Sequence, residues 1–110
     1  EQMKERFFTF YENIRKAHPH TPILLVEHAP FTSGRFDTEM ADLIARKNAL
    51  LKESYKQLKK KGDKRVYYFS NEGMIGYDGE ATVDGYHFTD LGFMRYAEKL
   101  YPVLKKLMNK

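Results

Sequence analysis

Apolar residues recur every three or four positions in three stretches of the chain, the spacing that places side chains on one face of an α-helix. We predict helices over residues 2–18, over about 37–61 and from about 89 onward. Their predicted buried faces are Met3, Phe7, Phe10, Tyr11, Ile14 and Ala17 in the first, Met40, Leu43, Ile44, Leu51, Tyr55 and Leu58 in the second, and Leu91, Met94, Ala97, Tyr101, Leu104 and Met108 in the third.

Residues with special backbone preferences mark the ends of these helices. Pro19 ends the first helix, and Gly62 ends the second, for which Asp37 is the predicted N-cap. Pro102 lies inside the third pattern, where it cannot donate to the Glu98 carbonyl and clashes with it. A kink or break is therefore expected near that position.

Two short apolar runs, Ile23–Val26 and Val66–Phe69, are typical of strands covered on both faces. The order strand, helix, strand predicts a right-handed crossover and hence a parallel pair. The fold class is therefore α/β. Two strands cannot complete such a sheet, so we expect residues 1–110 to be the C-terminal part of a single larger domain.

Composition narrows the possible classes. The 110 residues contain no cysteine, which excludes disulfides and thiolate metal sites. Much of the net charge of +4 lies in the Lys- and Arg-rich segment 56–65. A solvated helix end explains this segment better than a nucleic-acid surface does, because basic side chains complement the helix dipole there. No apolar run approaches the roughly 20 residues needed to span a bilayer, so we expect a soluble chain.

Asp84 and His87 carry the candidate chemistry. They follow the second predicted strand through a glycine-rich loop, and ligands of parallel sheets sit beyond the carboxyl ends of the strands. The spacing allows Asp84 to accept a hydrogen bond from Nδ1–H, which leaves Nε2 as a general base. Thr89 can cap the next helix and hold the loop. The alternative is that Asp84 only caps a turn beside an inert His87, and spacing alone leaves both open.

The sequence VDGYHFTDLGFMRYAEKLYPVL resembles the last conserved block of the GDSL, or SGNH, hydrolases, in which an Asp-x-x-His pair precedes the C-terminal helix; Asp84 and His87 match that pair. The upstream sequence IRKAHPHTPILLVEHAPF looks like the late helix and strand of the same family, with phrasing closest to bacterial carbohydrate-active esterases. The resemblance implies a flavodoxin-like three-layer sandwich, a serine nucleophile, an acyl-enzyme, and hydrolysis of small-molecule or carbohydrate esters without a cofactor.

The chain departs from the family in lacking both the Gly-Asp-Ser nucleophile block and the Gly-x-Asn oxyanion block. Ser33, Ser70 and Asn71 lack these contexts, and Phe88 stands where the family often has proline. We therefore expect the nucleophile to lie in a missing N-terminal part of the domain, and the 110 residues alone to be nearly inactive. The competing interpretation is a non-catalytic flavodoxin-like scaffold or interaction module.

Other polar residues give weaker signals. His18 and His20 flank a proline without a recognised metal spacing, and the acids and glycines of residues 77–85 lack the ligand order of a calcium loop. We assign no metal. Glu27 and His28 follow the first strand and either line the rim of the active site or simply terminate the strand.

Overall fold

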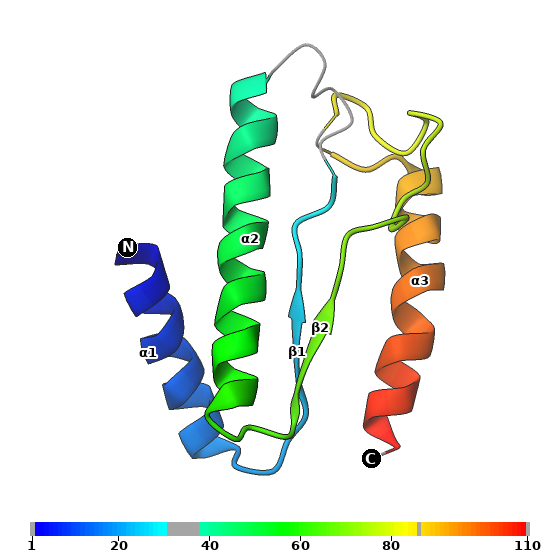
Figure 1. Ribbon diagram of the computed structural model, residues 1–110. Coiled ribbons are helices and arrows are strands. Elements are labelled where there is room, and N and C mark those ends of the chain that lie inside the picture. The colour runs from blue at the N-terminus through cyan, green and yellow to red at the C-terminus, as the bar shows by residue number, and fades with distance from the viewer. Residues whose placement is uncertain (1, 31–37, 86, 110) are drawn as a thin grey trace.

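The computed structural model describes residues 2–30, 38–85 and 87–109 and places three helices around a two-stranded sheet (Figure 1). The elements are α1 (Gln2–Ala17), β1 (Ile23–Val26), α2 (Thr38–Lys60), β2 (Val66–Phe69) and α3 (Asp90–Met108). The starts of all five elements, and the ends of α1, β1, α2 and β2, lie within two residues of the predicted positions; no end was predicted for α3. The predicted N-cap Asp37 lies outside the described residues.

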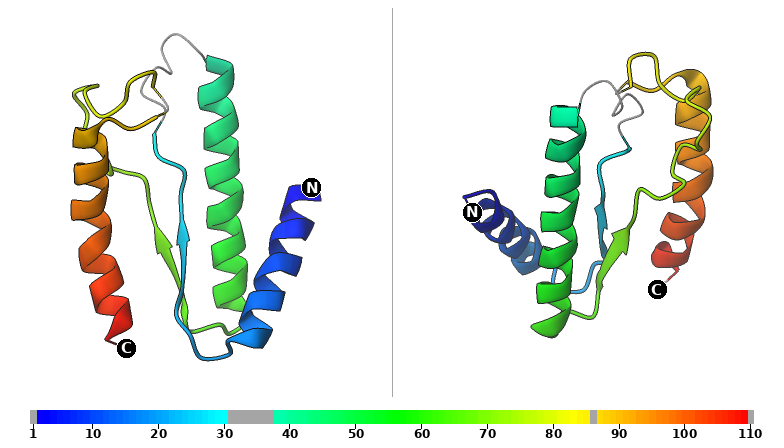
Figure 2. Two further views of the ribbon diagram at one scale, coloured as in Figure 1. Left: turned by 180° about the vertical axis from the view of Figure 1, so that it is seen from behind. Right: turned by 45° about the horizontal axis from the view of Figure 1, so that its top comes forward.

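The elements form three layers, with α1 and α2 on one side of the sheet and α3 on the other (Figures 1 and 2). The strands are parallel, as predicted, and Ile23 pairs with Val66 and Val26 with Phe69. The carboxyl ends of both strands lie at the same end of the molecule as the N-termini of α2 and α3 (Figure 1). The segments that leave the strands are therefore gathered at that end.

The core consists of two clusters of buried side chains. The first lies between α1, α2 and the sheet and centres on Tyr11, Leu25, Leu58 and Val66. The second centres on Met74, Ile75 and Ala81, which belong to the irregular segment between β2 and α3. Because each fully buried large apolar side chain contributes about 1.5–3 kcal/mol, this irregular segment is part of the core and not a loose connection.

Asp63, just after α2, joins the lower ends of α1, α2 and β2. Its carboxylate accepts hydrogen bonds from the Tyr11 hydroxyl, from Arg15 Nε at 3.1 Å and from the Arg65 amide at 2.9 Å. Arg15 also donates to the backbone carbonyl of Arg65 at 3.1 Å. Burial and the hydrogen bond to Asp63 raise the pKa of Tyr11. Asp63, Tyr11, Arg15 and Arg65 thus form one hydrogen-bonded cluster.

The predicted buried faces hold for α2 but not for α3. In α2, Ile44 and Leu58 are buried as expected, and only Leu43 is marginally exposed at 37%. In α1, Tyr11 is buried, whereas Met3, Phe10 and Ala17 are exposed. In α3 the prediction was wrong for most positions: Leu91 is half-buried, and the exposed positions are Met94, Ala97, Tyr101, Leu104 and Met108.

The failure in α3 has a simple cause, because apolar residues surround most of this helix. Gly92 and Leu107 are its buried residues, and Tyr96, Leu100 and Val103 are half-buried. The rest of the chain, including the irregular segment around Ala81, therefore covers one apolar side and leaves another uncovered. Periodicity identifies apolar positions but cannot choose between two apolar sides.

Of the kink or break expected near Pro102, the break is absent, since α3 continues from Asp90 to Met108 (Figure 1). Both Pro102 and Glu98 are exposed. Water can therefore reach the Glu98 carbonyl that proline leaves without an intrahelical donor.

Candidate catalytic site

Asp84 and His87 lie in a short hairpin formed by residues 82–88, immediately before α3. Thr82 and Phe88 form an antiparallel bridge. The Val83 amide donates to the His87 carbonyl at 2.9 Å, and the Gly85 amide donates to the Thr82 hydroxyl at 3.0 Å. Gly85 has a φ of +88°, a conformation that side chains with a Cβ rarely adopt. Glycine at this position thus permits the turn that returns His87 toward Asp84.

The Asp84 carboxylate holds His87 through two hydrogen bonds. Oδ1 accepts from the His87 backbone amide at 2.7 Å, and Oδ2 lies 2.7 Å from the imidazole Nδ1. The contact expected from the spacing is therefore present. Since an ionised carboxylate can only accept, Nδ1 is the donor and Nε2 is the acceptor when the imidazole is neutral. The side chains are 52% and 75% exposed for Asp84 and His87, respectively, so the pair lies at the surface.

His87 faces a groove of about 620 Å³ at the carboxyl end of the sheet. Glu27 and His28, which follow β1, line the same groove, and the structure thus brings both to the rim that the sequence suggested. The remaining lining residues are apolar: Val26, Ala29, Phe88, Phe93 and Tyr96. The groove therefore combines His87, His28 and Glu27 with an aromatic wall formed by Phe88, Phe93 and Tyr96.

Glu27 is fixed by hydrogen bonds from β2 and the segment after it. Its carboxylate accepts from the Tyr68 hydroxyl and from the Asn71 amide at 2.8 Å. Burial, followed by the hydrogen bond and the charge of Glu27, raises the pKa of Tyr68 well above its usual value. Glu27 therefore has a clear structural role at the end of β1, in addition to its place beside the groove.

Asn48 and Asn71 hold the backbone of His28. Asn48 accepts from the His28 amide at 2.8 Å and donates to its carbonyl at 3.2 Å, while Asn71 donates to the same carbonyl at 2.9 Å. The sequence argued against Asn71 as an oxyanion donor and gave it no other role. Its position two residues after β2 was the available signal for a role at the strand ends.

Arg95 anchors the irregular segment to α3, a role that the sequence analysis did not find. Its guanidinium donates to the Ile75 carbonyl at 2.9 Å and to both Asp78 oxygens at 2.8 and 2.7 Å. The hydrogen bond from Arg95 lowers the pKa of Asp78 well below its usual value. Gly76 makes room for this contact, because a Cβ there would lie 2.7 Å from Arg95 Nη1.

Of the two predicted loop serines, only Ser70 is described, and it forms a local hydrogen bond. Ser70 is exposed, and its hydroxyl accepts from the Glu72 amide at 3.2 Å, as in a local turn. Ser33 lies outside the described residues. Ser54 is buried in α2, where it donates to the Leu50 carbonyl at 2.8 Å.

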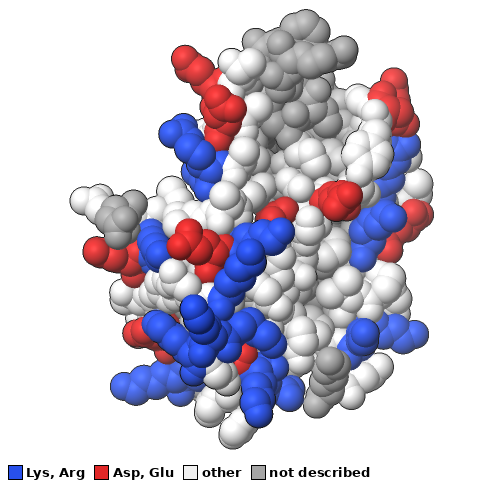
Figure 3. Space-filling view, viewed as in Figure 1, with Lys and Arg blue, Asp and Glu red and all other residues white. Residues whose placement is uncertain are grey.

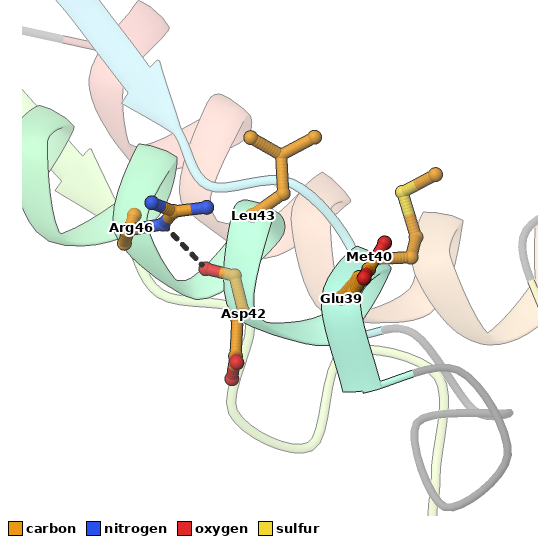
Figure 4. Close-up of a pocket in the computed structure, with 5 residues that line it drawn as sticks. All are labelled: Glu39, Met40, Asp42, Leu43 and Arg46. Carbon is orange, nitrogen blue, oxygen red and sulfur yellow. Dashed lines mark hydrogen bonds between the residues drawn. The ribbon is translucent and has the colours of Figure 1, made fainter.

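A second depression, of about 440 Å³, lies on the first turns of α2 (Figure 4). All of its described lining residues come from this one helix, and Arg46 donates to the Asp42 carbonyl at 3.4 Å. The depression is lined by Glu39, Met40, Asp42, Leu43 and Arg46. None of these residues is a histidine or a hydroxyl nucleophile, so the depression does not compete with the groove as a catalytic site.

Other surface features lie away from the groove. Lys and Arg side chains gather over the lower ends of α1 and α2 (Figure 3), where Lys59 and Lys60 occupy the last turn of α2. No three potential metal-binding His, Cys, Asp or Glu side chains come together within residues 2–30, 38–85 and 87–109. Among the described helices, none is long and apolar enough to cross a membrane.

Comparison with known proteins identifies the family of this chain. The model of the GDSL-like Lipase/Acylhydrolase family matches residues 1–105. No curated protein matches the chain. A crystal structure of a candidate GDSL-like lipase from Bacteroides ovatus superimposes with a TM-score of 0.89 at 32% sequence identity; the match covers 96% of this chain and 32% of that one. The chain therefore belongs to the GDSL-like lipase/acylhydrolase family and has the α/β fold of a GDSL-like hydrolase over about a third of the length of its structural relative.

Proposed function

We propose that these residues form part of a serine esterase or acylhydrolase in which His87 is the general base and Asp84 orients it. One observation carries the proposal: the 2.7 Å contact between Asp84 Oδ2 and His87 Nδ1 at the edge of a groove beyond the strand ends. Family membership supports hydrolysis of an ester. The arrangement of acid and imidazole is the one that general-base activation of a hydroxyl requires.

The mechanism follows from the two nitrogen atoms of His87. With Nδ1–H donating to Asp84, Nε2 takes the proton of a serine hydroxyl as its oxygen attacks the ester carbonyl. Asp84 stabilises the imidazolium, which then returns the proton to the leaving alcohol, so that an acyl-enzyme remains. Water next attacks the acyl group, and the same nitrogen accepts and returns its proton.

The serine nucleophile and the oxyanion donors come from a part of the domain outside these 110 residues, which form its C-terminal portion. The chain contains no Gly-Asp-Ser block, and the Bacteroides ovatus structure is about three times longer than the matched segment. The uncovered apolar side of α3 provides a surface on which the rest of a domain can pack. We therefore expect the 110 residues alone to have little or no esterase activity.

The proposed substrates are carboxylic esters, including acetyl esters of carbohydrates. The resemblance of residues 14–31 to bacterial carbohydrate-active esterases supports the carbohydrate portion. The aromatic wall formed by Phe88, Phe93 and Tyr96 supports binding of an apolar substrate face beside His87.

The test is His87→Ala in the complete protein, assayed with p-nitrophenyl acetate. We expect turnover to fall by at least about 10⁴-fold, the scale of removing the histidine of a serine-hydrolase triad. His20→Ala is the matched control, because His20 is also exposed but lies between α1 and β1, at the opposite end of the sheet. Near-normal turnover of folded His87→Ala would overturn the assignment of His87 as the general base, whereas absence of turnover in the wild-type complete protein would favour a non-catalytic scaffold.

A further inference from the structure

Thr89 closes the base of the hairpin that carries Asp84 and His87. Its hydroxyl donates to the Glu80 carbonyl at 3.0 Å and accepts from the Gly92 amide at 3.1 Å, while its own amide donates to the Ala81 carbonyl at 2.8 Å. One residue thus caps α3 and binds both residues that precede the hairpin. An ordinary N-cap needs only the bond to Gly92.

Gly92 allows α3 to approach this base more closely than any other residue could. A Cβ at position 92 would lie 2.1 Å from the Ala81 carbonyl oxygen and 3.2 Å from Phe88 Cβ. The Ala81 oxygen is a backbone atom that already accepts from Thr89, and Ala81 is only 2% exposed. The clash therefore cannot be relieved by rotating a flexible side chain.

A displacement at this base would reach the catalytic pair through a short, bonded path. Ala81 is followed by the bridge between Thr82 and Phe88, and the next hydrogen bond joins the Val83 amide to the His87 carbonyl. Only two residues, Thr82 and Val83, separate Ala81 from Asp84. Within the hairpin, the His87 amide donates to Asp84 Oδ1 at 2.7 Å, so the backbone conformation of the hairpin acts directly on the carboxylate.

We propose that Thr89 and Gly92 are positioning residues that fix the hairpin against α3 and thereby set the orientation of the Asp84–His87 pair. This inference rests on the proposed function. Neither residue touches the reacting atoms: Thr89 acts through the Glu80 and Ala81 carbonyls, and Gly92 acts through the absence of a side chain. Their loss should therefore reduce turnover more than substrate binding.

The primary test compares Thr89→Val with Thr89→Ser in the complete protein. Valine has nearly the shape of threonine but lacks the hydroxyl, whereas serine retains both hydroxyl bonds. With p-nitrophenyl acetate, we expect Thr89→Val to lower kcat by about 10- to 100-fold with a smaller change in KM, since ångström-scale misplacement costs rates of this order. Thr89→Ser should restore kcat to within a few fold. Thr9→Val, on the exposed side of α1, is the control.

A spectroscopic measurement tests the geometry independently of activity. An imidazole Nδ1–H bonded to a carboxylate gives a low-field ¹H NMR signal, which His87→Ala identifies by removing it. We expect Thr89→Val to weaken this signal and Thr89→Ser to retain it. Gly92→Ala should also weaken it and lower kcat, and this variant keeps the test available if Thr89→Val fails to fold.

The outcomes separate the two proposals. Normal kcat and an unchanged low-field signal in Thr89→Val and Gly92→Ala, with His87→Ala inactive, would overturn the positioning role and leave the proposed function intact. Full activity of His87→Ala would overturn the proposed function instead. A folded Thr89→Val with lower thermal stability but unchanged kcat and NMR signal would show that Thr89 is only a helix cap and would also overturn the positioning role.

Discussion

Asp63 and Asp84 use the same local chemistry at opposite ends of the molecule. Each carboxylate accepts a hydrogen bond from a backbone amide two or three residues later in the chain. Each also binds an aromatic side chain, Tyr11 for Asp63 and His87 for Asp84. They differ in burial and in their partners: the Asp63 side chain is 16% exposed and bound to Arg15, whereas Asp84 is 52% exposed and bound to a histidine. The buried carboxylate joins three elements, and the exposed one orients a group that can exchange protons.

Asp84→Asn tests the proposed catalytic role of Asp84 and should give the largest effect, a loss of turnover. Asparagine can still accept from the His87 amide, but its NH₂ group would face Nδ1, so the imidazole would have to carry its proton on Nε2. Because the equivalent inversion costs about 10⁴-fold in serine-protease triads, where the histidine remains in place, we expect a loss on the order of 10³-fold with p-nitrophenyl acetate.

Asp42→Asn, on the exposed side of α2, is the control for this prediction and should leave turnover unchanged. Wild-type turnover in folded Asp84→Asn would show that another group orients His87. Asp84 would then have no catalytic role to contrast with the structural role of Asp63.

Asp63→Ala should mainly affect stability. The substitution removes the acceptor for Tyr11, Arg15 and the Arg65 amide, and leaving such donors unsatisfied costs about 2 kcal/mol or more. We expect the free energy of unfolding, measured by urea denaturation, to fall by about this amount. Asp84→Ala, at the exposed hairpin, should change it by only about 1 kcal/mol or less, because water can replace the lost acceptor there. Equal destabilisation by the two variants would remove the distinction.

Tyr68→Phe tests the hydrogen bond between β2 and Glu27, which follows β1. The variant removes the hydroxyl that donates to Glu27 but leaves the Asn71 amide bound to the same carboxylate. We expect a loss of about 1 kcal/mol in the free energy of unfolding, since one acceptor bond is lost and one remains. Tyr101→Phe is the control, because Tyr101 is 63% exposed. An unchanged free energy of unfolding in Tyr68→Phe would contradict a stabilising hydrogen bond from Tyr68 to Glu27.

The smallest expected effect is the contribution of Asp63 to the pH dependence of stability. Desolvation raises the pKa of Asp63, but the hydrogen bonds from Tyr11 and the Arg65 amide and the charge of Arg15 outweigh it, so the net pKa is lowered. A carboxyl group with a lowered pKa stabilises the fold above its unfolded pKa of about 3.9, and this contribution is lost as the pH falls through the folded value.

The difference in unfolding free energy between wild type and Asp63→Asn should therefore stay constant above about pH 5 and shrink below about pH 4. Urea denaturation of both proteins across this range measures it. A difference that grows as the pH falls would contradict the direction of the pKa shift.

The elements and the parallel pairing were predictable because their signals are local. Four apolar residues at Ile23–Val26, directly after Pro22, are typical of a short buried strand, and an intervening helix makes the next strand parallel. The buried side of α2 was also predictable, since its polar side is unmistakable. The buried side of α3 was not, because the choice between its apolar sides depends on tertiary packing, such as that of Gly92 against Ala81.

In the candidate site, too, contacts between residues close in sequence could be predicted, and contacts between distant residues could not. The contact between Asp84 and His87 spans three residues, and the Thr89 cap spans three more, so both could be proposed from spacing. The pairing of Arg95 with Asp78 spans 17 residues, and that of Glu27 with Tyr68 spans 41. No periodic pattern connects such positions, because the fold alone brings them together.

The burial of Met74 and Ile75 within an irregular segment has a practical consequence for altering this protein. These two side chains are 1% and 0% exposed, and Arg95 ties the backbone beside them to α3. Connections without helix or strand are usually the places where deletions, grafted sequences and protease cuts are tolerated. Here, shortening or replacing the connection at 73–76 would open the interior, whereas the turn at Tyr77, which is 83% exposed, offers the safer point of insertion.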